Sequence, residues 1–162
     1  MNLSFIIPTL NEERTLLLNQ IFLKKIRKYL NAELIVVDGG SHDSTVNIAK
    51  TLSCNVYISE PSRSKQFNLG AKHAKGKYLV FLHADTILDN DAINHLKNIN
   101  KNTQWGFFNI KIKSNNFKYK ILSALINIRS RLFNYATGDQ VMIMENNFFY
   151  RVKGFKEIYL ME

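Results

Sequence analysis

Polar side chains that could bind a ligand follow each of four short apolar runs in this sequence. They are Thr9, Asn11 and Glu12 after the first run, Asp38 and Ser41 after the second, Arg63 and Gln66 after the third, and His83 and Asp85 after the fourth. Such carboxylates, amides and hydroxyls can hold the hydroxyls and phosphates of a nucleotide, or a hard divalent cation. Taken singly, Asn11 and Ser41 also fit a role in shaping turns. Their occurrence at matching positions along the chain indicates a ligand site.

The elements that must position these groups alternate between apolar runs of strand length and longer stretches of helical period. Strands are expected at 3–8, 34–37, 56–59, 78–83, 104–113 and 140–144, and helices at 12–30, 43–52, 64–74, 89–100 and 116–135. This alternation predicts one α/β domain over residues 1–162, with a mainly parallel central sheet and helices on both faces. Ligands bind outside the carboxyl ends of parallel strands, so the polar groups are expected to converge at one edge of the sheet.

The composition is typical of a globular chain with an excess of positive charge. Hydrophobic residues make up 46% of the sequence, which excludes a disordered or collagen-like chain. The 22 Lys and Arg residues against 13 Asp and Glu give a net charge of +9, which attracts anionic partners. Alternatively, the excess reflects a compositional bias toward Asn and Lys without any partner. No recognised binding motif accompanies the charge, so we expect no nucleic-acid partner.

The cysteine count and the apolar runs bear on localisation. Cys54 is the only cysteine, so an intrachain disulfide is excluded and a reducing cytoplasm is the expected compartment. The first residues lack the basic and then apolar pattern of a signal peptide. No window approaches the roughly 18 apolar residues that a membrane-spanning helix needs. We expect a cytoplasmic protein that is not integral to the membrane.

Four segments of the sequence carry motifs of a known family. They are FIIPTLNE at 5–12, LIVVDGGSHDST at 34–45, SRSKQFNLGA at 62–71 and FLHADT at 81–86. In order, they resemble the two opening motifs, the arginine-containing donor loop and the metal-binding DXD-type motif of the family 2 glycosyltransferases. The resemblance covers essentially the whole chain and implies an inverting, metal-dependent transferase with the GT-A, Rossmann-like fold. Within that family, HADT and RSxQxNxGA are most similar to a bacterial subgroup of radical-SAM- or selenium-domain-associated transferases.

The resemblance implies a site for a UDP-sugar donor within residues 1–100. The residues implied to line the base and ribose pocket are Pro8, Thr9, Asn11 and Glu12. Asp38 would accept a hydrogen bond from the uracil N–H, as a carboxylate at a strand end can. Arg63 would bind the base or diphosphate with help from Gln66. The alternative for Arg63 is a solvated surface arginine.

Asp85 is the residue that the resemblance and its chemistry assign to a metal. One carboxylate, together with diphosphate oxygens and water, suits Mg²⁺ or Mn²⁺. The cation would neutralise the departing diphosphate as a Lewis acid. His83 stands where the family motif has its first aspartate. It either ligates Mn²⁺, donates a hydrogen bond to a phosphate, or only ends the strand.

The acceptor side of the family fold corresponds to residues 101–162. Inversion requires an acceptor hydroxyl to attack opposite the diphosphate, with a carboxylate nearby to take its proton. The segment GFKEIYLME at 154–162 resembles the approach to the family's acidic pair, whose aspartate would be the residue after Glu162. Either the sequence is a fragment of a longer product, or Glu162 replaces the base. Asp139 resembles part of the acceptor-side loop, where it orients the acceptor or only follows Gly138 in a turn.

The stretch 116–135 is basic and of helical period. It contains Lys118, Lys120, Arg129 and Arg131 and no acidic residue. This pattern suits a peripheral contact with lipid headgroups at the inner membrane face, or a lipid-phosphate acceptor. A helix packed on the sheet with a solvated basic face explains the same residues.

The predicted function is transfer of a sugar from a UDP-sugar donor to an unknown acceptor hydroxyl, with inversion and a divalent cation. A nucleotidyltransferase also combines an α/β sheet with a metal-binding aspartate. Its usual glycine-rich phosphate loop is missing, because residues 9–12 contain no glycine. A nucleotide-sugar-binding domain without catalytic activity is the third alternative.

Overall fold

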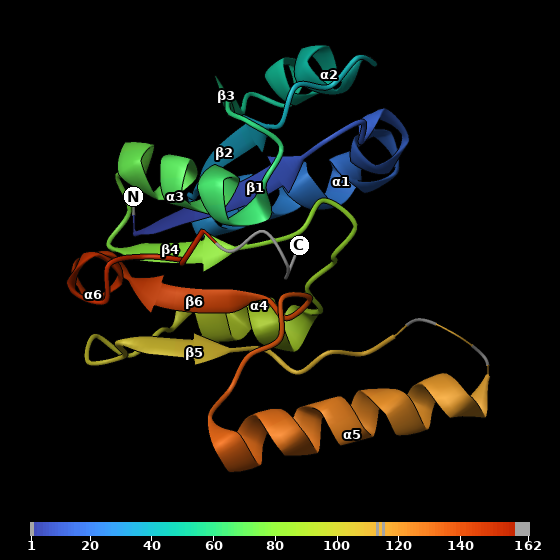
Figure 1. Ribbon diagram of the computed structural model, residues 1–162, viewed down its shortest axis with the longest axis vertical. Coiled ribbons are helices and arrows are strands. Elements are labelled where there is room, and N and C mark those ends of the chain that lie inside the picture. The colour runs from blue at the N-terminus through green and yellow to red at the C-terminus, as the bar shows by residue number, and fades with distance from the viewer. Residues whose placement is uncertain (1, 113, 115, 158–162) are drawn as a thin grey trace.

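The apolar runs form the strands of one six-stranded sheet in the computed structural model, which describes residues 2–112, 114 and 116–157 (Figure 1). The strands are β1 (Leu3–Thr9), β2 (Glu33–Asp38), β3 (Asn55–Ile58), β4 (Tyr78–Phe81), β5 (Trp105–Phe107) and β6 (Met142–Glu145). Their spatial order is β3-β2-β1-β4-β6-β5. The first four run parallel, and β6 is inserted antiparallel between β4 and β5. The predicted mainly parallel α/β fold is confirmed.

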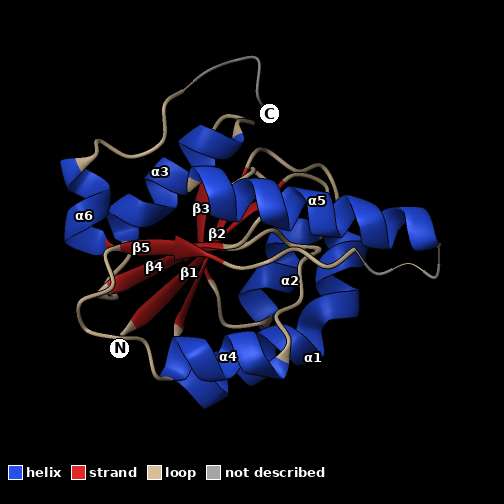
Figure 2. Cartoon of the chain, turned by 90° about the horizontal axis from the view of Figure 1, so that it is seen from below, coloured by secondary structure: helices blue, strands red, loops and turns tan. Residues whose placement is uncertain are grey.

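Helices cover both faces of this sheet, as Figure 2 shows. They are α1 (Glu13–Leu30), α2 (Thr45–Thr51), α3 (Arg63–His73), α4 (Asn90–Lys97), α5 (Phe117–Phe133) and α6 (Asn146–Arg151). Along β1, Phe5 and Ile7 belong to the core shared with α1 and α4, whereas Ile6 belongs to the core shared with α3 and α6. Because both faces are buried, β1 is a continuous apolar run rather than an alternating one.

The segment after β5 departs from the strand predicted at 104–113, of which residue 113 lies outside the described residues. Pairing with β6 ends at Phe107, and side chains then bond the backbone. The Gln140 amide donates to Phe108 O, and the Asn127 side chain bonds both the N–H and the C=O of Ile110. These bonds satisfy backbone groups that a strand would pair in a ladder. The strand is therefore shorter than its apolar pattern indicates.

Other element ends differ from the predicted ones by a few residues. The last strand begins at Met142 rather than at 140, because the Gln140 side chain is buried and bonded inside the preceding loop. Helix α2 begins at Thr45 rather than at 43, and α4 ends at Lys97 rather than at 100. The short helix α6 was not predicted.

Cys54 lies buried between α2 and β3. Burial disfavours the thiolate and raises the pKa of this thiol to about 12. A thiol with so high a pKa is a poor nucleophile, so Cys54 acts as a core residue. Within the part of the chain that the structure describes, no helix combines the length and the apolarity needed to cross a bilayer.

Candidate functional site

A cleft of about 1580 Å³ lies at the carboxyl ends of β1 and β4 and extends toward α5. Of the residues predicted to bind substrate or metal, those that line it are Pro8, Thr9, Glu12, Arg63, Gln66, His83, Asp85 and Asp139. The structure thus brings together groups from β1, α3, the segment after β4 and the loop before β6. Asn11 and Asp38 are not among the lining residues. Glu162 lies outside the described residues.

Asp38, at the end of β2, is 1% exposed and bonded through both carboxylate oxygens. Oδ1 accepts from the hydroxyls of Thr9 at 3.0 Å and Ser41 at 2.5 Å. Oδ2 accepts from the backbone N–H groups of Gly40 at 3.0 Å and Ser41 at 2.7 Å. A carboxylate offers about four acceptor positions, so protein donors fill those of Asp38. In this conformation, Asp38 shapes the turn at 39–41, where Gly40 has a positive φ of 92°.

Asn11 joins the loop after β1 to the loop after β2. Its N–H donates to the Ser41 hydroxyl at 2.7 Å, and its Oδ1 accepts from the His42 N–H at 2.9 Å. Asn11 has a φ of 55°, a left-handed conformation that Asn tolerates better than most residues. Its amide therefore holds the two loops against each other.

Asp43 extends this junction to the starts of α1 and α2. It accepts from the Thr45 hydroxyl, from the Thr45 N–H at 2.9 Å and from the Glu13 N–H at 3.1 Å. These bonds, chiefly the one from the Thr45 hydroxyl, hold the pKa of Asp43 below its usual value. Asp43 therefore accepts from backbone donors at the starts of two helices.

Gln66, on the first turns of α3, is 4% exposed. Its side-chain amide donates to Thr9 O at 2.9 Å and to Val37 O at 2.7 Å. These carbonyls lie on the neighbouring strands β1 and β2. Gln66 therefore ties α3 to the sheet edge from which the cleft opens, and its amide group positions the start of that helix.

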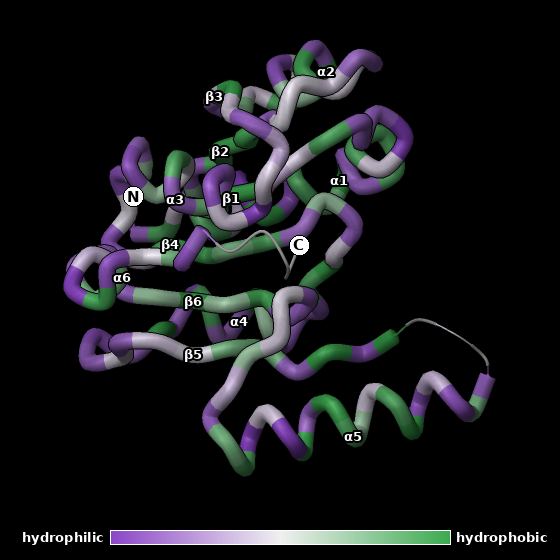
Figure 3. Tube along the Cα trace, in the orientation of Figure 1, coloured by the Kyte–Doolittle hydropathy of each residue, from purple (hydrophilic) through white to green (hydrophobic). Residues whose placement is uncertain are grey.

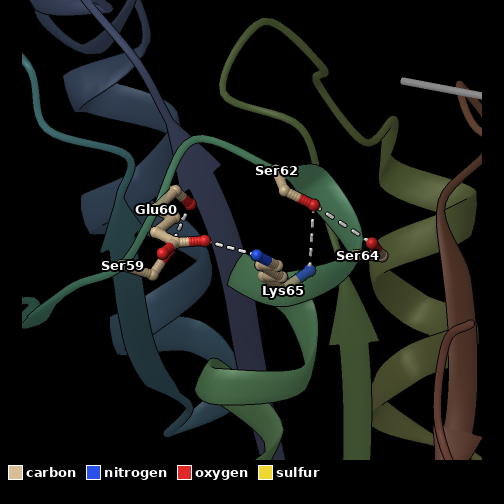
Figure 4. A network of polar contacts seen from close by, with 5 residues as sticks. All are labelled: Ser59, Glu60, Ser62, Ser64 and Lys65. Carbon is tan, nitrogen blue, oxygen red and sulfur yellow. Dashed lines mark hydrogen bonds and ion pairs between the residues drawn. The ribbon is translucent and has the colours of Figure 1, made fainter. Parts of the chain in front are cut away.

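Polar contacts among its side chains fix the segment 59–65, which leads into α3 (Figure 4). Arg63, in this segment, lines the cleft. The Ser62 hydroxyl caps α3 by accepting from the Lys65 N–H at 3.4 Å. Glu60 pairs with the Lys65 ammonium, and this bond lowers the pKa of Glu60. Arg63 lies 3.9 Å from the Asp139 carboxylate, from Nη1 to Oδ1, with side chains 52% and 76% exposed. Such an exposed ion pair is weak. A bound ligand can therefore replace Asp139 as the partner of Arg63, or Arg63 as the partner of Asp139.

Asp85 follows β4 and is exposed in the cleft. Its carboxylate accepts from the Thr86 hydroxyl at 3.3 Å. His83 is turned differently: its Nε2 lies 2.5 Å from Gly138 O, and its ring packs edge-on against Phe67. A carbonyl oxygen only accepts, so Nε2 is the protonated nitrogen in this bond. His83 thereby joins the end of β4 to the loop that carries Asp139.

Asn19 on α1 supports the Asp85 segment and was missed from the sequence. It is 8% exposed, and its amide donates to Ala84 O at 2.7 Å. A signal was present, because Asn19 falls at helical spacing between Leu16 and Phe22, on the buried face of α1. A polar residue on such a face requires a partner.

The far wall of the cleft combines apolar and basic side chains that were not predicted. They come from the end of β5, the segment after it and α5, and are Phe107, Phe108, Ile110, Lys111, Ile112, Leu122, Ile126 and Arg131. Gln140 anchors the loop beneath Asp139, since its Oε1 accepts from the Ser130 hydroxyl at 2.9 Å and from the Thr137 N–H at 2.8 Å. The cleft therefore has one wall of strand-end polar groups and one wall of mixed apolar and basic groups.

The donor set around Asp85 fits a cation that is held jointly with a ligand. No cluster of three or more His, Cys, Asp and Glu that could hold a metal occurs in the described ranges 2–112, 114 and 116–157. Mg²⁺ and Mn²⁺ are commonly bound through one or two carboxylates plus substrate phosphates and water. An exposed single carboxylate in a cleft is sufficient for that arrangement.

Comparisons with known proteins assign a family to nearly the whole chain. The family model for Glycosyl transferase family 2 matches residues 4–159. An uncharacterized glycosyltransferase of Haemophilus influenzae is 32% identical over 104 residues, which are 56% of this chain and 39% of that protein. An uncharacterized glycosyltransferase of Rickettsia prowazekii is 36% identical over 74 residues, 44% of this chain and 23% of that protein. The chain thus spans well under half the length of these relatives.

Solved structures of glycosyltransferases share the fold. S. aureus TarS 1-349 in complex with UDP superposes with a TM-score of 0.69 at 19% identity, covering 97% of this chain and 51% of that one. The mannosyltransferase PcManGT from Pyrobaculum calidifontis, in complex with GDP-Man and Mn²⁺, gives a TM-score of 0.67 at 19% identity, covering 96% and 48%. At such low identity, the likeness supports the fold.

Proposed function

We propose, because this chain belongs to glycosyl transferase family 2, that it transfers a sugar from a UDP-sugar donor to an acceptor hydroxyl with inversion. The observation that carries the proposal is the single cleft that gathers Asp85, Arg63 and Asp139 from three separate parts of the chain. The Asp85 carboxylate suits a divalent cation, and the Arg63 guanidinium suits a diphosphate. The remaining carboxylate, Asp139, pairs with Arg63 and lies on the loop before β6, within the residues assigned to the acceptor side.

The donor side of the cleft is assigned to residues 1–100. Pro8, Thr9 and Glu12 line it beside Arg63. The complexes of TarS with UDP and with UDP-GlcNAc support a uridine nucleotide, although PcManGT binds GDP-Man. The HADT and RSxQxNxGA motifs further support placement in the radical-SAM- or selenium-domain-associated subgroup.

Asp85 is the residue that would hold Mn²⁺ or Mg²⁺ together with the donor diphosphate. The cation, when bound, supplies Lewis-acid stabilisation of the charge that develops on the leaving diphosphate. The Mn²⁺ in the PcManGT structure and in a Mycobacterium tuberculosis glucosyl-3-phosphoglycerate synthase supports a divalent cation. His83 holds the Gly138 carbonyl in this conformation, so its contribution is to position the loop rather than to ligate.

The acceptor side is assigned to residues 101–162. Asp139 would orient the acceptor hydroxyl and, when it is not paired with Arg63, could take the proton that this hydroxyl releases. Glu162 is the second candidate for that proton. The two candidates differ in one measurement: only the variant of the true base would lose the acidic limb of the pH profile of kcat, where protonation of that carboxylate lowers the rate.

Product analysis tests the proposed reaction class. The chain is incubated with Mn²⁺, a UDP-sugar and candidate hydroxyl acceptors, and nucleotide products are separated by ion-exchange chromatography. Acceptor-dependent release of UDP is expected, because a transferase breaks the bond between the sugar and the diphosphate. A second incubation contains a nucleoside triphosphate and a sugar phosphate. Release of pyrophosphate there would instead indicate a nucleotidyltransferase. Donor binding without any product would indicate a binding domain without activity.

The choice of base is expected to depend on Asp38. Uracil N3 donates a hydrogen bond whereas cytosine N3 accepts one, so UDP should bind roughly 10- to 100-fold more tightly than CDP. Asp38→Asn should remove most of that preference in titration calorimetry. The carboxylate is already bonded by four protein donors, so uracil must displace one of them. Ser41→Ala removes one of these donors, a hydroxyl on a residue that is only partly buried, and should keep or increase the preference.

The Ser41 variant also serves as the control for the turn at 39–41. If Asp38 only shapes that turn, Asp38→Asn and Ser41→Ala should weaken UDP and CDP binding by similar factors. That pattern would remove Asp38 from the base site.

A further inference from the structure

Helix α5 lies along the outside of the molecule (Figure 1), and hydrophobic and hydrophilic residues alternate along it (Figure 3). Many of its large apolar side chains are exposed. Five apolar residues at three- and four-residue spacing form one stripe along it. They are Phe117, Ile121, Leu125, Ile128 and Leu132, with between 45% and 73% of each side chain exposed. An ordinary surface helix packs such a stripe onto the core. We call this set the α5 stripe.

The opposite side of α5 is polar and faces the protein. Ser123 and Ser130 are 7% and 0% exposed, and they are the buried residues of this helix. Ser123 accepts from the Ile112 N–H at 3.1 Å, and Asn127 bonds Ile110 N and O at 2.8 and 2.9 Å. Ser130 donates to Gln140 Oε1 at 2.9 Å. These bonds hold the helix in the orientation that exposes the stripe, and turning it over would bury unpaired groups.

Basic residues flank the α5 stripe, and residues 116–135 include no acidic residue. At 100° per residue, Lys118 and Arg129 lie together on one side of the stripe and Lys120 and Arg131 on the other. All four side chains are exposed. The helix therefore presents an apolar stripe with cationic side chains along both of its edges. This arrangement complements a surface in which a layer of negative charge covers an apolar interior.

We propose that α5 docks the protein onto an anionic lipid bilayer, lying in the membrane plane with its stripe among the acyl chains. Burial of exposed apolar side chains and attraction of lysines and arginines to anionic headgroups are the two contributions that bind such helices. Pairing with a second copy of α5 is less favourable, because the basic flanks of the two helices would meet without any acidic partner. The inference does not depend on the donor or on the reaction.

Docking in this orientation places the cleft beside the bilayer. Arg131, at the edge of the stripe, and Leu122 and Ile126, nearer the protein-facing side of α5, also line the far wall of the cleft. An acceptor held at the membrane surface would reach the cleft along α5 without leaving the lipid layer.

Vesicle co-sedimentation tests the apolar contribution. The chain should bind vesicles of phosphatidylcholine and phosphatidylglycerol, and Leu125→Gln with Leu132→Gln should lower the partition coefficient about 10-fold or more. The matched control is Leu18→Gln with Ile21→Gln on α1, where the side chains are 72% and 79% exposed. That control should leave the partition coefficient unchanged. Equal losses in both double variants, or no sedimentation of the unmodified chain, would overturn the proposal.

The charge contribution is tested in the same way. Lys118→Gln with Arg129→Gln should lower partition onto phosphatidylglycerol vesicles roughly 10-fold or more, and should not change the weaker binding to pure phosphatidylcholine. Lys24→Gln with Lys28→Gln on α1 removes the same charge elsewhere and should have little effect. Light scattering after size exclusion completes the test. A concentration-dependent dimer that only the α5 variants abolish would assign the stripe to a second copy and contradict membrane docking.

Discussion

Replacing Asp85 with Asn is expected to abolish the increase in UDP affinity that Mn²⁺ produces, and to lower sugar transfer by roughly 10²-fold or more. Asn keeps the size of the side chain and one oxygen but loses the negative charge that a hard cation requires. The fold should survive, because Asp85 is exposed and its bond to Thr86 is long at 3.3 Å. Titration calorimetry of UDP with and without Mn²⁺ measures the first effect, and UDP release at saturating donor measures the second.

Asp91 provides the matched control for this experiment. It is an exposed aspartate that lines the same cleft from the first turn of α4. Asp91→Asn removes the same charge and should preserve the Mn²⁺ effect on UDP affinity. A full Mn²⁺ response in Asp85→Asn would remove Asp85 from the metal site, and loss of the response in Asp91→Asn alone would move that site to α4.

Gly70→Ala is expected to destabilise the protein by about 2 kcal/mol or more, although Gly→Ala in a helix ordinarily stabilises by about 1 kcal/mol. The sign reverses because α3 lies close against the sheet at this point. A Cβ on Gly70 would come 2.2 Å from Ile6 Cγ2 and 3.1 Å from Val37 Cγ2. Neither branched side chain can retreat in the core between α3 and the sheet. Urea unfolding followed by circular dichroism measures the change in the free energy of unfolding.

Two further variants show whether this contact is the cause. Gly106→Ala makes the same chemical change where the nearest atom is 3.7 Å away, and should alter stability by less than about 0.5 kcal/mol. Ile6→Ala removes the clashing Cγ2, so its cost should be smaller in the Gly70→Ala background than in the native chain. Additive costs would show that Gly70 and Ile6 do not compete for the same space. Because Gln66 and Arg63 lie on the same helix, Gly70→Ala should also weaken donor binding.

The site residues were predictable where a strand end exposes a polar group. Asp85 and Arg63 follow apolar runs directly or after a short turn, and the topology of parallel strands brings such positions to one cleft. The same rule selected Asp38, Asn11 and Gln66, whose polar atoms bond the protein in this conformation. Residue type and position do not show whether such a polar group is free to bind a ligand or is bonded within the protein. The donors to Asp38 include Thr9, which is 29 residues away along the chain.

The sequence by itself determined how strands and helices alternate along the chain. A strand buried on both faces must be apolar throughout, and the apolar residues of a helix packed on one face must repeat about every 3.6 residues. Only the tertiary structure decided how α5 is turned and where β5 ends. The period of Phe117, Ile121 and Leu125 indicates an amphipathic helix but not which side meets the protein. That choice depends on bonds from Ser123 and Asn127 to the backbone 11 and 17 residues earlier. Hydrogen bonds between distant segments form only once the chain is folded, so no local pattern records them.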